Sequence, residues 1–158
     1  MESYEVRRKL LSLGPSYEIT RPGEEALLLT VKGTMTSMKL TLRTGADGPE
    51  LAQLDPNWLG TTYEMKAPNG EKVATLTFPM LALKQSFELV LGSRTLKADG
   101  GFLATSFRCV EADGQVAFTV SWQVGWTDQF LVEVQDGFPR DVAVLATIAI
   151  QKKFYDNA

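Results

Sequence analysis

The chain contains a single run of three basic residues, Arg7-Arg8-Lys9, close to its first residue. On a β-strand, Arg7 and Lys9 point to one face and Arg8 points to the other. Guanidinium and ammonium groups attract phosphate, and each basic residue beside an anionic membrane surface contributes about 1 kcal/mol. The triplet is therefore a candidate contact for anionic lipid headgroups. The alternative is a solvated strand end, whose charges discourage pairing with another chain.

A second group of candidates consists of large apolar side chains between the expected strands. Six of them would form an apolar surface at one end of the fold: Trp58, Leu59, Met80, Leu81, Trp122 and Trp126. Exposed aromatic patches usually mark a contact, so Trp58, Met80 and Trp126 are candidates for a partner surface. The alternative is that these side chains cover the end of a buried helix.

Patterns for catalysis or metal binding do not occur in the sequence. There is no histidine, which excludes Ser-His-Asp and Cys-His nucleophiles and histidine-ligated zinc. The single cysteine, Cys109, cannot form an intrachain disulfide, and its alternation with Arg108 places it in the core. No EF-hand loop, Walker A loop or G-x-S-x-G motif is present. We expect no catalytic residue, no metal and no cofactor; a hydrolase would instead need a cleft of carboxylates with perturbed pKa values.

Composition and charge restrict the partners. The 158 residues suit a single domain over residues 1–158, and 16 basic against 19 acidic residues give a net charge of 16 − 19 = −3. This acidity argues against nucleic acid as a partner. The start of the chain lacks the pattern of a signal peptide, and the apolar stretch Val142–Ile150 is far shorter than the ~20 residues of a membrane-spanning helix. We expect a cytoplasmic protein without a membrane span.

Period-2 alternation of apolar and polar residues runs through most of the chain before residue 135 and predicts β-strands. Three related hairpins begin at Ser16, Thr62 and Ser106, each with a hydroxyl residue, an aromatic residue, a short strand, a glycine turn and a longer apolar strand. A second type of hairpin alternates with the first. With Tyr4–Lys9 as an additional strand, the pattern predicts twelve strands over residues 4–134.

The alternation stops after Pro139, a residue that suits the first turn of a helix. Over residues 139–155, apolar residues cover the whole circumference of a helical wheel, and such a helix is normally buried on every side. A helix with its side chains is about 10–12 Å wide and would fill the bore of a twelve-stranded barrel. We predict a mainly β fold: a closed twelve-stranded antiparallel β-barrel around a buried C-terminal α-helix. A lipocalin-type carrier, with eight strands, an open cavity and an outer helix, is the alternative.

These features together resemble the LURP-one-related family, whose domain is similar to the tubby C-terminal domain and to the phospholipid scramblases. The likeness lies in VRRKLLSLGPSYEI near the start, the three Tyr- or Phe-led hairpins, TDQFLVEV, and the apolar helix after Pro139. It implies a twelve-stranded barrel around a buried helix. Most members have no established enzymatic activity, whereas tubby-like domains are associated with phosphoinositide headgroups and scramblases with lipid movement. The loops at 55–59, 78–81 and 122–126 differ from those of many relatives, because they are mostly neutral or apolar.

The sequence therefore predicts a non-enzymatic binding or scaffolding protein with an unknown protein or lipid partner. Peripheral binding of anionic lipid headgroups such as phosphoinositides, through Arg7, Arg8 and Lys9, is the first alternative. A small-ligand carrier of the lipocalin type is the second.

Overall fold

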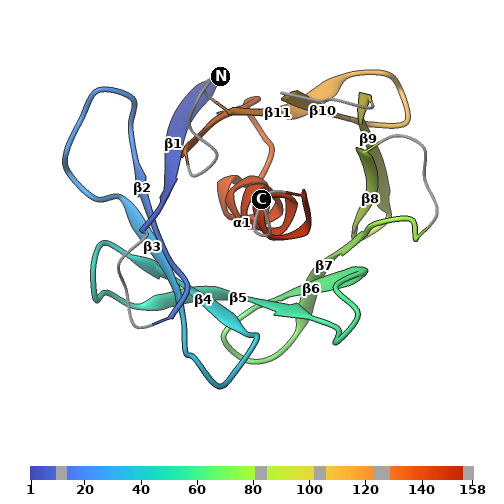
Figure 1. The fold of residues 1–158 in the computed structure, drawn as a ribbon. Coiled ribbons are helices and arrows are strands. Elements are labelled where there is room, and N and C mark those ends of the chain that lie inside the picture. Colours follow the sequence, from blue (N-terminus) through green and yellow to red (C-terminus); the bar gives the residue numbers. More distant parts are fainter. Residues whose placement is uncertain (10–13, 81–84, 102–105, 123–128, 155–158) are drawn as a thin grey trace.

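The computed structural model describes residues 1–9, 14–80, 85–101, 106–122 and 129–154. Twelve strands and one helix follow in chain order: β1 (Glu2–Arg8), β2 (Ser16–Thr20), β3 (Leu29–Gly33), β4 (Leu40–Thr44), β5 (Glu50–Pro56), β6 (Thr62–Lys66), β7 (Lys72–Thr77), β8 (Gln85–Leu91), β9 (Arg94–Gly101), β10 (Ser106–Val110), β11 (Val116–Trp122), β12 (Gln129–Val134) and α1 (Arg140–Phe154). Each strand pairs with its neighbours in the sequence, and β1 pairs antiparallel with β12, so the sheet closes into a barrel (Figure 1). The predicted closed twelve-stranded barrel is confirmed.

Alternation of apolar residues decides which face of each strand points inward. In β1, Tyr4 and Val6 are buried, whereas Glu5 between them is partly exposed. Successive side chains of a strand point to opposite faces, so the same pattern recurs around the barrel and lines its interior with apolar groups. The core therefore lies inside the barrel.

Glycine turns close the related hairpins β6–β7 and β10–β11. Gly70 and Gly114 have φ angles of +91° and +90°, a left-handed conformation that other residues adopt at a cost in free energy. The side chains of Asn69 and Asp113 each accept a hydrogen bond at 2.9 Å from the backbone N–H two residues later. The two turns thus share one geometry, as the repeated sequence pattern predicts.

The helix α1 runs through the inside of the barrel (Figure 1). It begins directly after Pro139, and ten consecutive residues, Val142–Gln151, are buried. Each large aliphatic side chain buried in this way contributes about 1.5–3 kcal/mol relative to an exposed one, so the helix is a major part of the core. Because the helix occupies the lumen that a cargo would need, the eight-stranded lipocalin alternative does not fit.

The two ends of the barrel differ, because antiparallel strands place successive connections at opposite ends. Helix α1 begins at the end formed by the connections 21–28, 45–49, 67–71, 92–93, 111–115 and 135–139, which we call the entry end. It finishes at the opposite end, whose described connecting residues are 9, 14–15, 34–39, 57–61 and 78–80; we call this the exit end. There the ring of Phe154, the last residue of α1, lies 5.3 Å from that of Phe78 and 5.7 Å from that of Phe107. These aromatic contacts hold the end of the helix inside the barrel.

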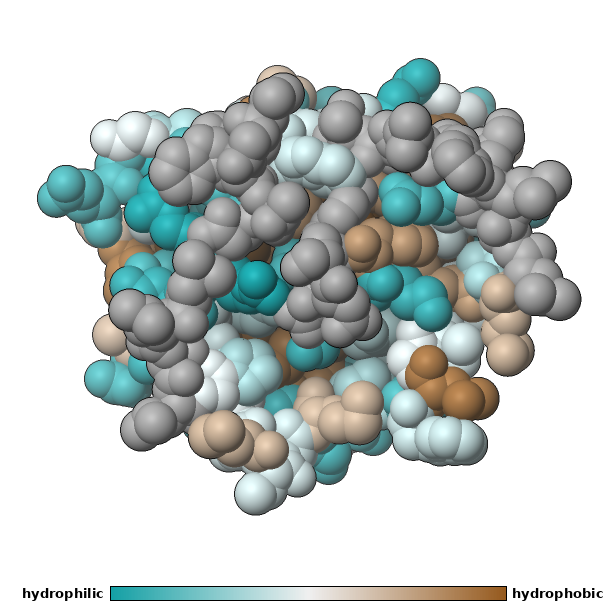
Figure 2. Space-filling model, viewed as in Figure 1, coloured by the Kyte–Doolittle hydropathy of each residue, from teal (hydrophilic) through white to brown (hydrophobic). Residues whose placement is uncertain are grey.

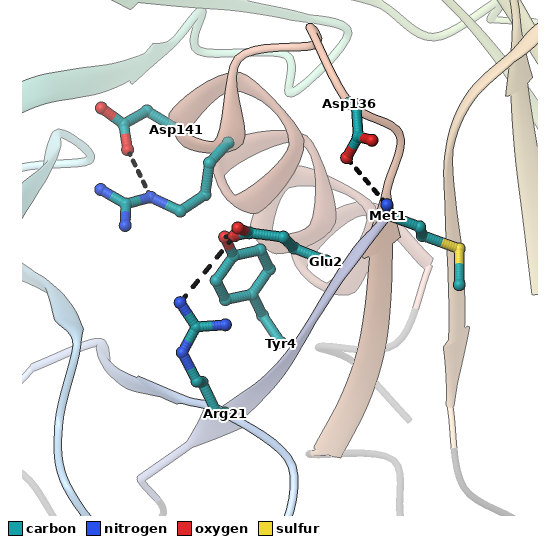
Figure 3. Close-up of polar contacts among 7 residues, drawn as sticks. Met1, Glu2, Tyr4, Arg21, Asp136 and Asp141 are labelled. Atoms are coloured by element: carbon teal, nitrogen blue, oxygen red, sulfur yellow. Dashed lines mark hydrogen bonds and ion pairs between the residues drawn. The ribbon is translucent and has the colours of Figure 1, made fainter.

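Polar contacts surround the first turn of α1 at the entry end. Figure 3 shows them: the Met1 amino group donates to Asp136 at 2.8 Å, Glu2 accepts a hydrogen bond from the Tyr4 hydroxyl and lies 3.9 Å from Arg21, and Arg140 donates to Asp141 at 3.4 Å. Burial, and then the hydrogen bond to Glu2, raise the pKa of Tyr4 above its usual value. The phenol therefore stays protonated and remains a donor to Glu2. We assign these contacts a structural role at the start of the helix.

Candidate binding site

A pocket with a volume of about 610 Å³ opens at the exit end of the barrel. Its walls come from the end of β1, the connection to β2, the start of β2, the β3–β4 connection and the last turn of α1. The lining residues are Arg8, Lys9, Gly14, Pro15, Tyr17, Thr34, Met35, Ser37, Met38 and Lys152. We call it the exit pocket. Residues from the two ends of the chain meet there because strand β1 and helix α1 finish at the same end of the barrel.

The position of Arg8 at the end of a strand explains how its side chain reaches the pocket. Arg8 continues the inward alternation of Tyr4 and Val6 along β1. The first two side chains pack in the core, whereas Arg8 is the last residue of the strand and lines the opening instead. Its neighbour across the β1–β2 pair is Tyr17, which also lines the pocket. The alternation along β1 that places Tyr4 and Val6 in the core therefore also places the Arg8 guanidinium at the opening of the barrel.

Backbone contacts hold the pocket wall together. The N–H of Gly33 donates to the carbonyl of Pro15 at 2.9 Å, and the N–H of Lys9 donates to the carbonyl of Ser16 at 2.8 Å. Gly14 has a φ of +131°, and a Cβ at this position would lie 3.1 Å from the carbonyl oxygen of Gly33. A side chain at position 14 would therefore push the β1–β2 connection away from β3.

The exit pocket carries positive charge. Arg8, Lys9 and Lys152 line it, and none of the described lining residues is acidic. Lys9 also lies 3.3 Å from Glu18, but this ion pair is partly exposed to solvent and therefore weak. The last turn of α1 brings partly negative backbone carbonyls to this end, and Lys152 and Lys153 offset them. The pocket is thus suited to an anion.

A buried hydrogen bond fixes the helix beside the pocket. The Tyr17 hydroxyl donates to Gln151 Oε1 at 2.7 Å, and both side chains are buried. The other amide atom, Gln151 Nε2, is buried and has no hydrogen-bond partner within the described part of the chain. A buried donor without a partner costs about 1–3 kcal/mol. The contact therefore positions the turn that carries Lys152 at some cost in stability.

The structure divides the basic triplet. Arg8 and Lys9 line the exit pocket, but Arg7 is exposed on the outer face of β1, opposite Glu18 of β2. Arg7 lines a different hollow, together with the acidic residues Glu5, Glu18, Glu24 and Glu25. These carboxylates compete with an anionic ligand for Arg7. Two of the three predicted basic residues therefore share one site, and the third does not.

The structure places three residues of the predicted apolar surface in exit-end connections. Trp58 and Met80 are 83% and 74% exposed, and Leu59 is 50% exposed. Trp122 packs against the core instead, with its ring 6.4 Å from that of Phe130. Trp126 and Leu81 lie outside the described residues.

The sequence alone does not identify Lys152, Met35 and Met38 as site residues. Lys152 lies in the last turn of an apolar helix, and the two methionines lie in a loop, so neither pattern indicates a pocket. Lys152 could be predicted as a site residue only from the topology of the barrel. A helix that enters the barrel after β12 finishes at the end where β1 finishes, which brings its last turn to Arg8.

The Cys109 thiol is not a reactive group in the folded protein. It is 1% exposed, as expected from the strand pattern, and burial, together with the nearby Glu111, raises its pKa to about 12. The thiol is therefore protonated at neutral pH and shielded from reagents. Within the described ranges there is also no group of three or more Cys, Asp and Glu side chains that could hold a metal ion.

The arrangement of twelve strands around one helix coincides with a family match over nearly the whole chain. A family model described as LURP-one-related matches residues 2–151. The chain belongs to the LURP-one-related family. The matched residues of this LURP-one-related domain include every strand of the barrel and most of α1. Among curated proteins, the chain has no match.

Membership in the LURP-one-related family agrees with the observed fold. The barrel around a central helix is consistent with the tubby-like and scramblase-like superfamily that the sequence resembles. Neither the family nor the fold is typical of enzymes. Over the described residues, no helix has both the length and the apolar character needed to cross a membrane.

Proposed function

We propose that this LURP-one-related protein is a non-enzymatic binding protein that holds a phosphate-bearing anion in the exit pocket. The observation that carries the proposal is the grouping of Arg8, Lys9 and Lys152 around one hollow whose described lining contains no acidic side chain. A non-enzymatic role is supported by the family and the fold, which are not typical of enzymes.

The size and donors of the pocket favour a phosphorylated organic group over a single inorganic ion. Its volume of about 610 Å³ lies within the range of about 300–1,000 Å³ that is usual for small-molecule sites. Arg8 offers a planar guanidinium that can bind two phosphate oxygens, and Lys9 and Lys152 add point charges. Thr34 and Ser37 bring hydroxyl groups to the same lining. The headgroup of an inositol phospholipid, or the corresponding soluble phosphate ester, combines the required charge and size.

Titration calorimetry with inositol trisphosphate, and with inorganic phosphate for comparison, tests the pocket. Arg8→Gln and Lys152→Gln should each weaken trisphosphate binding by about 10- to 100-fold, because a hydrogen bond to a charged group contributes about 1.5–3 kcal/mol. Arg7→Gln is the matched control, since Arg7 lies on the outer face of β1 among carboxylates. Equal affinities of the wild type and the two pocket variants contradict the proposal. An effect of Arg7→Gln as large as that of Arg8→Gln contradicts it as well.

Vesicles distinguish the two sources of such an anion. Co-sedimentation is measured at low salt, where electrostatic screening is weakest, with phosphatidylcholine vesicles that contain or lack an inositol phospholipid. Retention only on the vesicles with the inositol phospholipid identifies a lipid headgroup, whereas trisphosphate binding without retention identifies a soluble ligand. The cytoplasmic leaflet carries anionic lipids, so the cytoplasmic location expected from the sequence remains part of the proposal.

A further inference from the structure

We propose that the exit end is a membrane-docking surface, where five apolar side chains enter the headgroup region of an anionic bilayer and the exit pocket receives a lipid headgroup. The inference rests on the proposed anion-binding function and adds the docking surface, the partner and the orientation of the barrel. The five side chains, which we call the exit rim, are Met35, Met38, Trp58, Leu59 and Met80.

Exposed apolar side chains are concentrated at the exit end. Every large apolar side chain that is exposed in a described connection belongs to the exit rim, including Met35 at 78% and Met38 at 53% exposure. The other exposed ones are Met1 at the start of the chain and Val73 and Val90 on the barrel wall. Figure 2 looks onto the exit end, and separate groups of tan to brown atoms lie in the lower part of this view among paler ones. A cluster of this kind usually marks a contact surface.

The two ends of the barrel differ in charge: basic residues predominate at the exit end and acidic residues at the entry end. An anionic surface attracts the exit end for this reason. The described connecting residues of the exit end include Lys9 and Lys39 and no acidic residue, and α1 adds Lys152 and Lys153. The entry-end connections contain one basic residue, Arg21, and the first turn of α1 adds Arg140 and Asp141 at that end. The same connections contain seven acidic residues: Glu24, Glu25, Asp47, Glu71, Glu111, Asp113 and Asp136. Although the net charge is −3, this separation turns the exit end toward an anionic membrane and the entry end away from it.

The arrangement of the exit rim favours a bilayer over a protein partner. Its side chains come from three separate connections, β3–β4, β5–β6 and β7–β8, and not from one continuous groove. A fluid bilayer adapts to separate insertions, and tryptophan and basic side chains are favoured at the boundary between headgroups and acyl chains. Met35 and Met38 also line the exit pocket. A headgroup bound in the pocket therefore brings the rim to the level of that boundary, with the C-terminal end of α1 facing the membrane.

Paired measurements on vesicles and in solution test the docking surface. The double variant Trp58→Ser/Met80→Ser removes two exposed rim side chains that are not among the lining residues of the exit pocket. We expect its binding to phosphatidylcholine vesicles containing an inositol phospholipid to fall by about tenfold or more, because the inserted apolar area is lost. Its affinity for soluble inositol trisphosphate should not change. Val90→Ser, on the barrel wall, is the control and should bind vesicles like the wild type.

The outcomes separate the docking surface from the pocket. If the double variant binds vesicles as tightly as the wild type does, the docking surface is wrong. The titration with inositol trisphosphate tests the exit pocket independently of this result. Failure of the wild type to bind vesicles, with a native mass that falls from dimer to monomer in the double variant, identifies a second copy as the occupant and also overturns the docking surface. Should circular dichroism show that the double variant does not fold, Leu59→Ser is judged by the same two measurements.

Discussion

Replacing Tyr17 by phenylalanine tests the contact that fixes the last turns of α1 beside the exit pocket. In the native protein the Tyr17 hydroxyl donates to Gln151 Oε1 at 2.7 Å, and Gln151 Nε2 is buried with no partner among the described residues. Tyr17→Phe removes the donor and leaves both polar atoms of the Gln151 amide buried without a partner. Each such atom costs about 1–3 kcal/mol, so the variant should lose about that amount of unfolding free energy.

We expect the double variant Tyr17→Phe/Gln151→Met to avoid the loss of stability that Tyr17→Phe causes. It removes both partners and replaces the amide by an unbranched apolar side chain of similar length, so no buried polar atom of this pair remains without a hydrogen bond. Replacement of both members of a buried hydrogen-bonded pair by apolar groups is often neutral or stabilising. Since the native amide already has one atom without a partner, we expect the double variant to be as stable as the wild type or more stable.

Urea denaturation monitored by circular dichroism measures both variants, and their m-values should equal that of the wild type. The expected order of unfolding free energies is Tyr17→Phe lowest, then the wild type, with the double variant equal or highest. A double variant that is less stable than Tyr17→Phe would refute the reasoning, because it would show that the Gln151 amide is satisfied without Tyr17.

Three further predictions concern the core. Ile148→Ala removes a side chain of α1 that is fully buried in the barrel and should lower the unfolding free energy by about 2–5 kcal/mol, against about 0.5–1.5 kcal/mol for Ile148→Val. Urea denaturation checks both, and a loss well below 1 kcal/mol for the alanine variant would speak against a helix in the lumen. The Cys109 thiol, with a pKa of about 12, should resist iodoacetamide in the folded protein at about pH 8 and react after unfolding in urea; rapid alkylation of the folded protein would contradict its burial. The pKa of the Cys109 thiol is about 12 in the folded protein and near 9.0 in the unfolded chain, so above about pH 9 the thiol ionises more easily in the unfolded chain. Its contribution to stability is therefore complete below pH 9.0 and is lost as the pH rises toward about 12. Cys109→Ala should accordingly lose less stability than the wild type over this alkaline range.

The fold could be predicted from the sequence because both of its parts have local signals. Asn69-Gly70 and Asp113-Gly114 indicate hairpin turns between alternating strands, and the structure has these turns with the expected glycine conformation. The helix after Pro139 is apolar around its whole circumference, a pattern that a surface helix does not show. Only an enclosed position satisfies such a helix, and a barrel of twelve strands offers one.

The candidate site was only partly predictable, because its charges depend on neighbours that are distant in the sequence. Arg7 and Arg8 are adjacent, yet alternation along β1 sends Arg7 to a surface with Glu24 and Glu25 and Arg8 to the exit pocket. Lys152 joins Arg8 only because β1 pairs with β12 and α1 returns through the barrel. The residues next to Arg7, Arg8 and Lys152 in the sequence do not indicate either of these spatial contacts. Strand periodicity indicates the face of each basic residue, but the closed topology decides which carboxylates or ammonium groups meet it.

The filled lumen also explains why the candidate site lies at an end of the barrel. Without α1, a twelve-stranded barrel would enclose a large apolar space, which is unfavourable at the packing density of protein interiors. The helix fills this space, so a ligand has access only to the barrel's outer surface and ends. At the exit end, the same helix supplies Lys152, directly after ten buried residues that hold its position. The part of the backbone that carries Lys152 is therefore held in place by the core before any ligand arrives, which lowers the entropy lost on binding. An anion bound between Arg8 and Lys152 would in turn link α1 to β1 and stabilise the folded barrel in proportion to its occupancy.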